Sequence, residues 1–506
     1  MKSDVIARSD KGGDEGVRNS RLVGSAFVLA ACYVFLCLII FLMIVINDPG
    51  GWIGFFRAKY AGILTLAVCT LLLCFIIYYY YYFEDREFLS RGRNVLLIFS
   101  LVTVCVILSY IFGKFVNIYA RPCALLALLC VFLFNRRQAI MLNFIFSILM
   151  FVIDTYTNNF SSDGATVQVY YSLMLNFVCG TFAIFAAAGN KTRGGLLLTG
   201  CVVAVPTVVI VTLLQVTSLY NDWIAFVASV GYSIVGCVVS AILALAGLPV
   251  FETAFNRLTV FRLRELTSTN APLLVRLKQE APGTFNHSLV VAQLAESCAV
   301  AIGENAELAR AAAYYHDVGK LKQPDCFTEN QTGYNVHDEL MPELSADIIR
   351  SHAKDGYELL MAAHFPKIIA DVAREHHGTL PIKYFYDKAM KLSGGDADIK
   401  DYSYLGPTPR SRIAAIVMIA DASEAATRAL SDRSPEQVER TVRSIIEERM
   451  DLDQFADCDI TIRDLTVIRR TLVETLSGVH HHRVEYPAIR FNRDRKAVKE
   501  TPEEKS

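Results

Sequence analysis

Long apolar stretches fill the first half of the chain, and they constrain the fold more than any other feature. Residues 22–250 carry few charges, whereas residues 251–506 are rich in Asp, Glu, Lys and Arg. A membrane-crossing helix needs about 20 apolar residues. We expect spans at about 22–46, 60–83, 94–116, 119–134, 138–156, 168–188, 194–218 and 222–249. The sequence therefore predicts an N-terminal tail over residues 1–21 and a membrane domain of about eight helices over residues 22–250.

The positions of basic residues predict the orientation of these spans. Lys and Arg gather in the N-terminal tail and in alternate loops, such as those holding Arg91 and Arg136, and such residues favour the cytoplasm. Eight spans then place both termini in the cytoplasm and the protein in the cytoplasmic (inner) membrane. The first span is too long for a cleaved signal peptide, so we expect it to stay as an anchor. Asp154 and Asp222 are expected in outer loops, which leaves no buried charged pathway of the kind that marks a transporter.

Cysteine usage and net charge narrow the environment and the partners. Ten of the thirteen cysteines lie in the apolar stretches, where they act as small hydrophobic residues, and the other three are scattered. This pattern favours a soluble half in a reducing compartment without a disulfide framework. The formal net charge of −1 gives no reason to expect DNA or RNA as a partner.

The second half has the pattern of a soluble all-α domain. Apolar residues recur at helical spacing from residue 284 onward, and alternating strand patterns are scarce. We expect a helical connector over residues 251–283, a helical cytoplasmic domain over 284–487 and a flexible charged tail over 488–506. The Gly-, Asp- and Pro-rich stretch 393–409 is predicted to be a surface loop.

Seven good metal ligands occur in this second half, and all ten histidines of the chain lie beyond residue 286. The seven are His287, His316, Asp317, His352, His376, His377 and Asp421. Adjacent residues on a helix point about 100° apart, so His316 can serve one metal ion while the carboxylate of Asp317 reaches between two. His287 and Asp421 could complete the first metal, and His352, His376 and His377 the second.

The type of ligand and the position of Lys320 indicate phosphate chemistry. Mixed imidazole and carboxylate ligands suit Mn, Fe or Zn better than Ca or Mg. Two such metals activate water and stabilise the attacking and leaving oxygens in phosphoester cleavage. Lys320 lies three residues after Asp317 and shares its helix face, where an ammonium stabilises negative charge on a phosphate. We therefore predict Asp317 and Lys320 as catalytic residues.

These residues carry a family resemblance. The order of His287, His316-Asp317 and Asp421 resembles that of the HD-domain phosphohydrolases. The chain looks most like their seven-transmembrane group, whose studied members hydrolyse cyclic di-AMP. The matching phrases are Glu280-Ala-Pro-Gly-Thr-Phe-Asn-His287, Tyr314-Tyr-His-Asp-Val-Gly-Lys320, Phe327-Thr-Glu-Asn-Gln331, His376-His-Gly-Thr379, Phe385-Tyr386 and Gly406-Pro407.

The resemblance implies a membrane-anchored phosphodiesterase. It implies a di-metal centre, with Mn²⁺ or Fe, on the seven ligands above, and conversion of cyclic di-AMP to linear 5′-pApA. The partners are then the cyclic dinucleotide and the lipid bilayer, and a homodimer is left open. Thr379, Tyr384, Tyr386 and Arg428 are candidate substrate contacts, since aromatic faces stack on adenine and a guanidinium pairs with phosphate.

The chain departs from the family at two places, and four other functions remain open. Only about residues 47–59 stand where the family carries a large extracytoplasmic domain, and Ile413 stands where an acid is common. The alternatives are hydrolysis of cyclic di-GMP, hydrolysis of another nucleotide, a receptor whose nucleotide-binding domain does not turn over, and a transporter. The Gly378-Thr-Leu-Pro381 sequence differs from the Gly-Tyr-Pro signature of cyclic di-GMP hydrolases.

Overall fold

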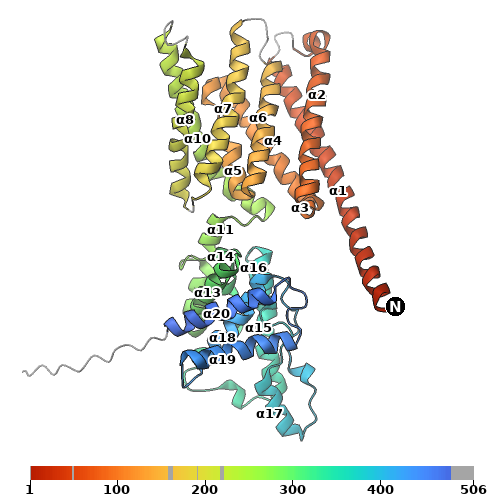
Figure 1. Ribbon diagram of the computed structural model, residues 1–506, viewed down its shortest axis with the longest axis vertical. Coiled ribbons are helices and arrows are strands. Elements are labelled where there is room, and N and C mark those ends of the chain that lie inside the picture. Colours follow the sequence, from red (N-terminus) through yellow and green to blue (C-terminus); the bar gives the residue numbers. More distant parts are fainter. Residues whose placement is uncertain (1, 48–50, 158–162, 191, 217–221, 480–506) are drawn as a thin grey trace, which may run out of the picture. The chain divides into compact units, whose positions relative to one another are not determined.

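Helices account for nearly all the regular structure of the chain. The computed structural model describes residues 2–47, 51–157, 163–190, 192–216 and 222–479. Among these residues there is no β-strand, only one isolated bridge between Pro381 and Ser403 (Figure 1). The all-α prediction is thus confirmed. The end of the predicted helical domain, residues 480–487, and the predicted tail, residues 488–506, lie outside the described residues.

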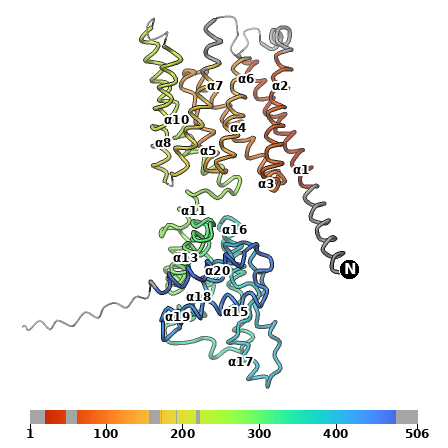
Figure 2. The backbone as a smooth tube through the Cα atoms, viewed as in Figure 1, coloured from red at the N-terminus to blue at the C-terminus, as the bar shows by residue number. Residues whose placement is uncertain are grey.

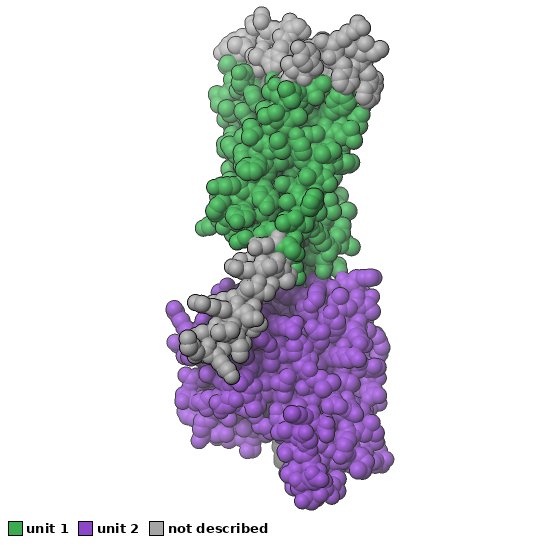
Figure 3. Space-filling model, turned by 90° about the vertical axis from the view of Figure 1, so that its right-hand side faces the viewer, with its two compact units in different colours: residues 1–268 green, residues 269–506 purple. Residues whose placement is uncertain are grey.

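The chain divides into two compact units, residues 1–268 and 269–506 (Figure 3). The boundary falls inside the predicted connector, so that residues 251–268 belong to the first unit. The elements of the first unit are α1 (Lys2–Asn47), α2 (Gly51–Glu84), α3 (Arg86–Ser90), α4 (Gly92–Phe115), η1 (Ile118–Ala120), α5 (Leu125–Leu133), α6 (Arg136–Thr157), α7 (Asp163–Ala187), α8 (Arg193–Leu214), α10 (Trp223–Phe255) and α11 (Val260–Leu266). The first helix therefore begins well before residue 22, because it continues through the polar segment that we expected to be a tail.

The long helices of the first unit form a membrane bundle. Six of them, α1, α2, α4, α6, α8 and α10, have the length and composition of membrane spans, and the apolar segment Ser172–Ala187 lies within α7. Large apolar side chains such as Phe27, Leu64 and Phe75 are exposed on the outside of this unit. A bundle that is apolar both inside and outside is stable in lipid rather than in water. The protein is therefore a multi-pass membrane protein.

The fourth predicted span crosses the bundle, but not as one helix. Arg121 lies beside Gly113 in the last turn of α4. At the other end of the segment, the ring of Phe134 is 5.9 Å from that of Phe88 in α3, just before α4 begins. Between these ends, η1 and the nine-residue α5 are separated by irregular backbone (Figure 2). The prediction of a continuous helix over 119–134 was wrong. Among the described residues of the first unit, α1, α2, α4, α6, α7, α8, α10 and the broken segment Ile118–Leu133 remain as candidate spans.

Protein surrounds the broken crossing on every side. Nearly all residues of α5 are buried, and α5 packs against α4, α6, α7 and α10. A Cβ atom on Gly236 of α10 would lie 2.6 Å from the carbonyl oxygen of Arg121. Non-helical backbone at membrane depth is tolerated where protein covers it, since lipid offers no hydrogen bonds. Glycine at this position lets α10 approach that backbone closely.

A buried ion pair fixes the start of the broken crossing. Nη1 of Arg121 donates to Oδ2 of Asp154 at 2.6 Å and to Oγ of Ser172 at 3.2 Å. Asp154 lies in α6 with an exposure of 1%, not in an outer loop as we expected. Asp222, in contrast, caps the N-terminus of α10 by accepting a hydrogen bond from the amide of Ala225. The membrane unit therefore holds buried charges, and their expected absence no longer argues against a transporter.

The second unit is a helical domain in which α13 is central. Its elements are α12 (Pro272–Glu280), α13 (Pro282–Ile302), α14 (Ala306–Tyr315), η2 (Val318–Lys322), η3 (Pro324–Cys326), η4 (Thr328–Asn330), η5 (Val336–Asp338), α15 (Pro342–Ala362), α16 (Lys367–Glu375), α17 (Lys383–Ser393), η6 (Ile399–Tyr402), α18 (Arg412–Arg428), α19 (Pro435–Asp451) and α20 (Ile462–Val479). Helix α13 packs against α14, α18 and α20. It is apolar and long enough to span a membrane, but this packing and its buried His287 assign it to the core of the second unit.

Local sequence sets the limits of the helices that carry the site. Asn305 caps α14 and Ser411 caps α18 through their side-chain oxygens, and Gly303 ends α13 with a φ of 78°. The stretch 393–409, predicted as a surface loop, returns to the domain core after η6. There the amide of Tyr404 donates to the carbonyl oxygen of Leu380 at 3.0 Å. Hydrogen bonding to the backbone at 380–382 therefore draws this stretch inward.

We predict that removing one partner of the Arg121–Asp154 pair destabilises the membrane unit more than removing both. Arg121→Met should destabilise the membrane unit by about 3–5 kcal/mol, because it removes the cation beside a buried carboxylate. The double variant Arg121→Met/Asp154→Leu should recover most of that loss, because it removes both charges. Unfolding of the purified protein in mixed micelles by SDS titration measures both. Equal destabilisation of the single and double variants would contradict the prediction.

Candidate metal centre

Five segments of the second unit converge on one buried site. His287 comes from α13, His352 from α15 and Asp421 from α18. The remaining ligand candidates stand at helix ends: His316 ends α14 and is followed by Asp317, and His376 ends α16 and is followed by His377. Helix ends bring both side chains of an adjacent pair to the same point, which a straight helix does not. All seven predicted ligands come together here.

The first group consists of His287, His316, Asp317 and Asp421, all buried. Nε2 of His287 lies 2.9 Å from Oδ1 of Asp421, and Nε2 of His316 lies 3.2 Å from Oδ2 of Asp317. One ligand atom from each residue lies within 4.8 Å of all the others. Two imidazoles and two carboxylates are thus arranged around one point.

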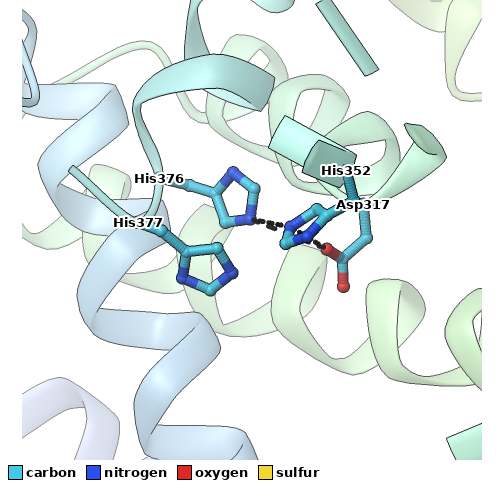
Figure 4. A group of neighbouring side chains, drawn as sticks. All are labelled: Asp317, His352, His376 and His377. Atoms are coloured by element: carbon cyan, nitrogen blue, oxygen red, sulfur yellow. Dashed lines mark hydrogen bonds and ion pairs between the residues drawn. The ribbon is translucent and has the colours of Figure 1, made fainter. Parts of the chain in front are cut away.

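The second group consists of Asp317, His352, His376 and His377 (Figure 4). Oδ1 of Asp317 lies 3.3 Å from Nε2 of His352 and 3.6 Å from Nε2 of His376. The two Nε2 atoms are 3.3 Å apart. Asp317 therefore belongs to both groups and presents a different oxygen to each.

The tautomers of the histidines fit a metal. Nδ1 of His316, His352 and His376 each donates to the backbone carbonyl three residues earlier, at 2.7, 2.5 and 2.9 Å. Each Nε2 then keeps its lone pair toward the centre of the site, as metal-binding histidines do. Nε2 of His316 and Oδ1 of Asp317 are buried without a hydrogen-bond partner. Buried acceptors without a donor need a cation nearby, and this set of ligand atoms fits a divalent transition metal.

The pKa shifts in the first group also indicate that the site needs positive charge. Burial lowers the pKa of His287, but Asp421 and Glu424 outweigh it and raise the pKa to about 9. Burial likewise opposes protonation of His316, and Asp317 and Asp421 raise its pKa to about 10. Burial raises the pKa of Asp317, but His316 and Lys320 outweigh it and hold that pKa well below its usual range. Without a metal ion, protons on the two histidines balance the carboxylates.

The second group is different because it has more histidines than carboxylates. Burial lowers the pKa of His352 to about 4, and it lowers the pKa of His377 well below its usual value, with His376 and His352 adding to the effect. These imidazoles are therefore neutral near pH 7, which is the form that binds a metal ion.

Lys320 stands at the edge of the first group. Its Nζ lies 2.8 Å from Oδ2 of Asp317 and 2.8 Å from Oε1 of Glu329. Burial lowers its pKa, but the two carboxylates outweigh burial and raise that pKa. Gly319, one residue earlier, is packed so tightly that a Cβ atom there would lie 2.0 Å from the carbonyl oxygen of His352. A glycine is thus required for η2 to pack against α15.

The four predicted substrate contacts lie in different surroundings. Oγ1 of Thr379, two residues after His377, accepts a hydrogen bond from Nε2 of Gln454 at 2.9 Å. Tyr384 is 64% exposed on α17. Tyr386 packs in a small core with Phe385, Ala389 and Tyr402. Arg428 is half-exposed, 3.6 Å from Glu424.

Three residues that sequence reasoning missed adjoin the ligands. Glu424 lies one turn after Asp421 and accepts a hydrogen bond from Nδ1 of His287 at 2.6 Å. Tyr404 stacks on His377 with ring centroids 4.3 Å apart, and Glu329 binds Lys320. The spacing of Glu424 from Asp421 was a usable signal, whereas Tyr404 lies in a stretch without helical periodicity. Ile413 is buried in the first turn of α18, eight residues before Asp421.

The fold and the site together define a class: a multi-pass membrane protein with a helical domain that carries two adjoining groups of metal-ligand candidates. Residues 60–259 match the family described as 7TM receptor with intracellular HD hydrolase, and residues 284–426 match the HD domain. The first match includes α4 to α10 and most of α2. The chain belongs to the family of seven-transmembrane proteins with an HD hydrolase domain.

Similar proteins have been named in two bacteria. The chain is 38% identical over 427 residues to the Cyclic-di-AMP phosphodiesterase PgpH of Bacillus subtilis, with 82% of this chain and 58% of the relative covered. It is 35% identical over 446 residues to the protein of the same name in Listeria monocytogenes, with 85% of this chain and 59% of the relative covered. The chain therefore spans less than two thirds of the length of these curated relatives. The crystal structure of the L. monocytogenes PgpH HD domain is 46% identical and covers 42% of this chain and 100% of its own, with a TM-score of 0.40.

We predict that Glu424 orients His287 for metal binding. Glu424→Ala should weaken metal affinity by about 10–100-fold, because an outer carboxylate fixes the tautomer and ring of its histidine. Glu424→Gln keeps an acceptor and should lose less, and Glu447→Ala, an exposed position on α19, should lose nothing. Competition with a chelator, followed by measurement of the metal retained, gives these affinities. Unchanged metal retention in Glu424→Ala would contradict the assignment.

Proposed function

We propose that the chain is a metal-dependent phosphodiesterase that hydrolyses cyclic di-AMP to linear 5′-pApA. The observation that supports it most is the pair of ligand groups that share Asp317, with the ammonium of Lys320 beside them. The names of the curated relatives agree with the substrate. His287, His316, Asp317 and Asp421 would hold one divalent ion, and Asp317, His352, His376 and His377 the other. Manganese or iron fits these ligands.

The side chains of the site divide the work of phosphoester cleavage. The bound metals would supply Lewis acidity and an activated water. Lys320 would donate hydrogen bonds to a phosphate oxygen and stabilise the charge that grows on it in the transition state. The neutral imidazoles of His352 and His377 would bind a metal ion without adding charge to the site. The backbone carbonyls that hold Nδ1 of His316, His352 and His376 would keep these rings in place throughout.

We also propose that the HD domain lies in the cytoplasm. Eight traversals keep both termini on one side, even though the fourth traversal is broken. The tail and the alternate loops on that side carry the excess of Lys and Arg. A cytoplasmic position also agrees with free cysteines throughout the chain and with a substrate that is a second messenger.

Hydrolysis by the full chain in lipid nanodiscs tests this proposal. With Mn²⁺ present, cyclic di-AMP should be converted to 5′-pApA, and His316→Ala or Asp317→Ala should lower kcat at least ~100-fold, since each removes a group that stabilises the transition state. His364→Asn is a matched control, because His364 is exposed, lies outside the site and has a φ of 57°, which asparagine tolerates. Chromatography of the nucleotides gives the rates.

The same assay separates the proposal from its alternatives. Faster cleavage of cyclic di-GMP than of cyclic di-AMP would reassign the substrate. Metal-loaded protein that binds cyclic di-AMP and leaves it intact would indicate a receptor. Full activity in His316→Ala would overturn the assignment of the site.

A further inference from the structure

The sequence phrase Phe327-Thr-Glu-Asn-Gln331 has no place among the metal ligands, yet it lies against the site. Residues Thr328–Asn330 form the short helix η4, which contacts α13. The ring of Phe327 meets His352 edge-on at 5.6 Å, and Nζ of Lys320 stands 5.0 Å from the centre of the same ring. Glu329, two residues after Phe327, accepts a hydrogen bond from Nζ of Lys320. Two residues of this segment thus contact Lys320, and the position of the segment needs an explanation.

Hydrogen bonds fix this segment to the first turn of α13. Oδ1 of Asn330 accepts from the amides of Gly283 and Thr284 at 2.9 and 3.1 Å. Nδ2 of Asn330 donates to Oγ1 of Thr284 at 2.9 Å, and that hydroxyl donates in turn to Oε1 of Glu329 at 3.0 Å. Thr284 lies one turn before His287. The segment and the first metal ligand are therefore held by the same helix.

Glu329 is the carboxylate next to Lys320 that stands outside both ligand groups. Asp317 contacts Lys320 as well, but both of its oxygens also face ligand atoms of the two groups. An ammonium near divalent cations is repelled by them, so it needs an anion that the metals do not engage. The side chains of Lys320 and Glu329 are each only 12% exposed, so solvent screens their attraction little.

We propose that Glu329 is a positioning residue for Lys320. The carboxylate, aligned by Thr284 and Asn330, holds Nζ at the edge of the first ligand group, where a phosphate oxygen of the substrate would bind. Phe327 closes the apolar side of the same space and limits the lysine to one direction. The phrase is therefore part of the phosphate-binding machinery, although it binds neither metal nor substrate itself. This inference rests on the proposed function.

A double-mutant cycle in the full chain tests this role. Glu329→Ala should lower kcat by roughly 100-fold, the order expected when one preorganised donor to the transition state is lost. Lys320→Ala should lower it similarly, and the double variant should be no slower than Lys320→Ala, because both act through one ammonium. Glu329→Gln keeps an acceptor for Nζ and should recover part of the rate. A merely structural role would instead give additive losses.

Two further measurements complete the test. Metal content and melting temperature should equal those of the parent protein in Glu329→Ala. Asp325→Asn, which removes an exposed carboxylate from the preceding helix η3, should leave kcat unchanged. Binding of inorganic phosphate to the Mn²⁺-loaded protein, measured by calorimetry, should weaken about 10-fold in both Glu329→Ala and Lys320→Ala.

The outcomes separate this inference from the proposed function. Additive losses in the double variant, loss of metal in Glu329→Ala, or phosphate affinity unchanged there while it falls in Lys320→Ala would each overturn the role of Glu329. If the parent protein cleaves no cyclic dinucleotide, the proposed function fails, and phosphate binding still decides whether Glu329 positions Lys320.

Discussion

A single buried carboxylate, Asp317, is the constraint on which the HD domain depends. Its two oxygens face two groups of ligand atoms, and its side chain is 2% exposed. A buried carboxylate is stable only when cations or donors surround it. The domain supplies them from five segments of the chain. Helix packing, the tight contact at Gly319 and the direction of Lys320 all follow from the need to bring these groups to one point.

Hydrogen bonds to the backbone hold most of the histidine rings of the site in their orientation. Three histidines stand at or inside helices where the carbonyl three residues earlier accepts from Nδ1. Each ring is thereby fixed by its own helix, without a further side chain. His287 differs from these three, because its Nδ1 binds the carboxylate of Glu424. That difference explains why Glu424 matters on α18 and why similar carboxylates are not needed beside His316, His352 and His376.

The membrane unit also buries polar groups, and it too surrounds them with packed helices. Irregular backbone between η1 and α5 and the pair Arg121–Asp154 would both be costly in lipid, and helices cover both. A continuous apolar run predicts a membrane span whether lipid or protein surrounds it. The sequence therefore could not distinguish α5 from its neighbours, and it could not place Asp154 against a partner 33 residues away.

The sequence by itself determined the all-α class, the apolar membrane half, the identity of the seven ligand candidates and their division into two groups. Apolar length, helical period and the order of histidines and aspartates are local properties, and they survive without knowledge of the fold. Tertiary structure alone decided which carboxylate holds Lys320 and which tyrosine reaches the site. Glu329, Tyr404 and Glu424 act on residues from 9 to 137 positions away. Such contacts depend on how helices pack, and the chain signals only one of them in advance, through the spacing of Glu424 from Asp421.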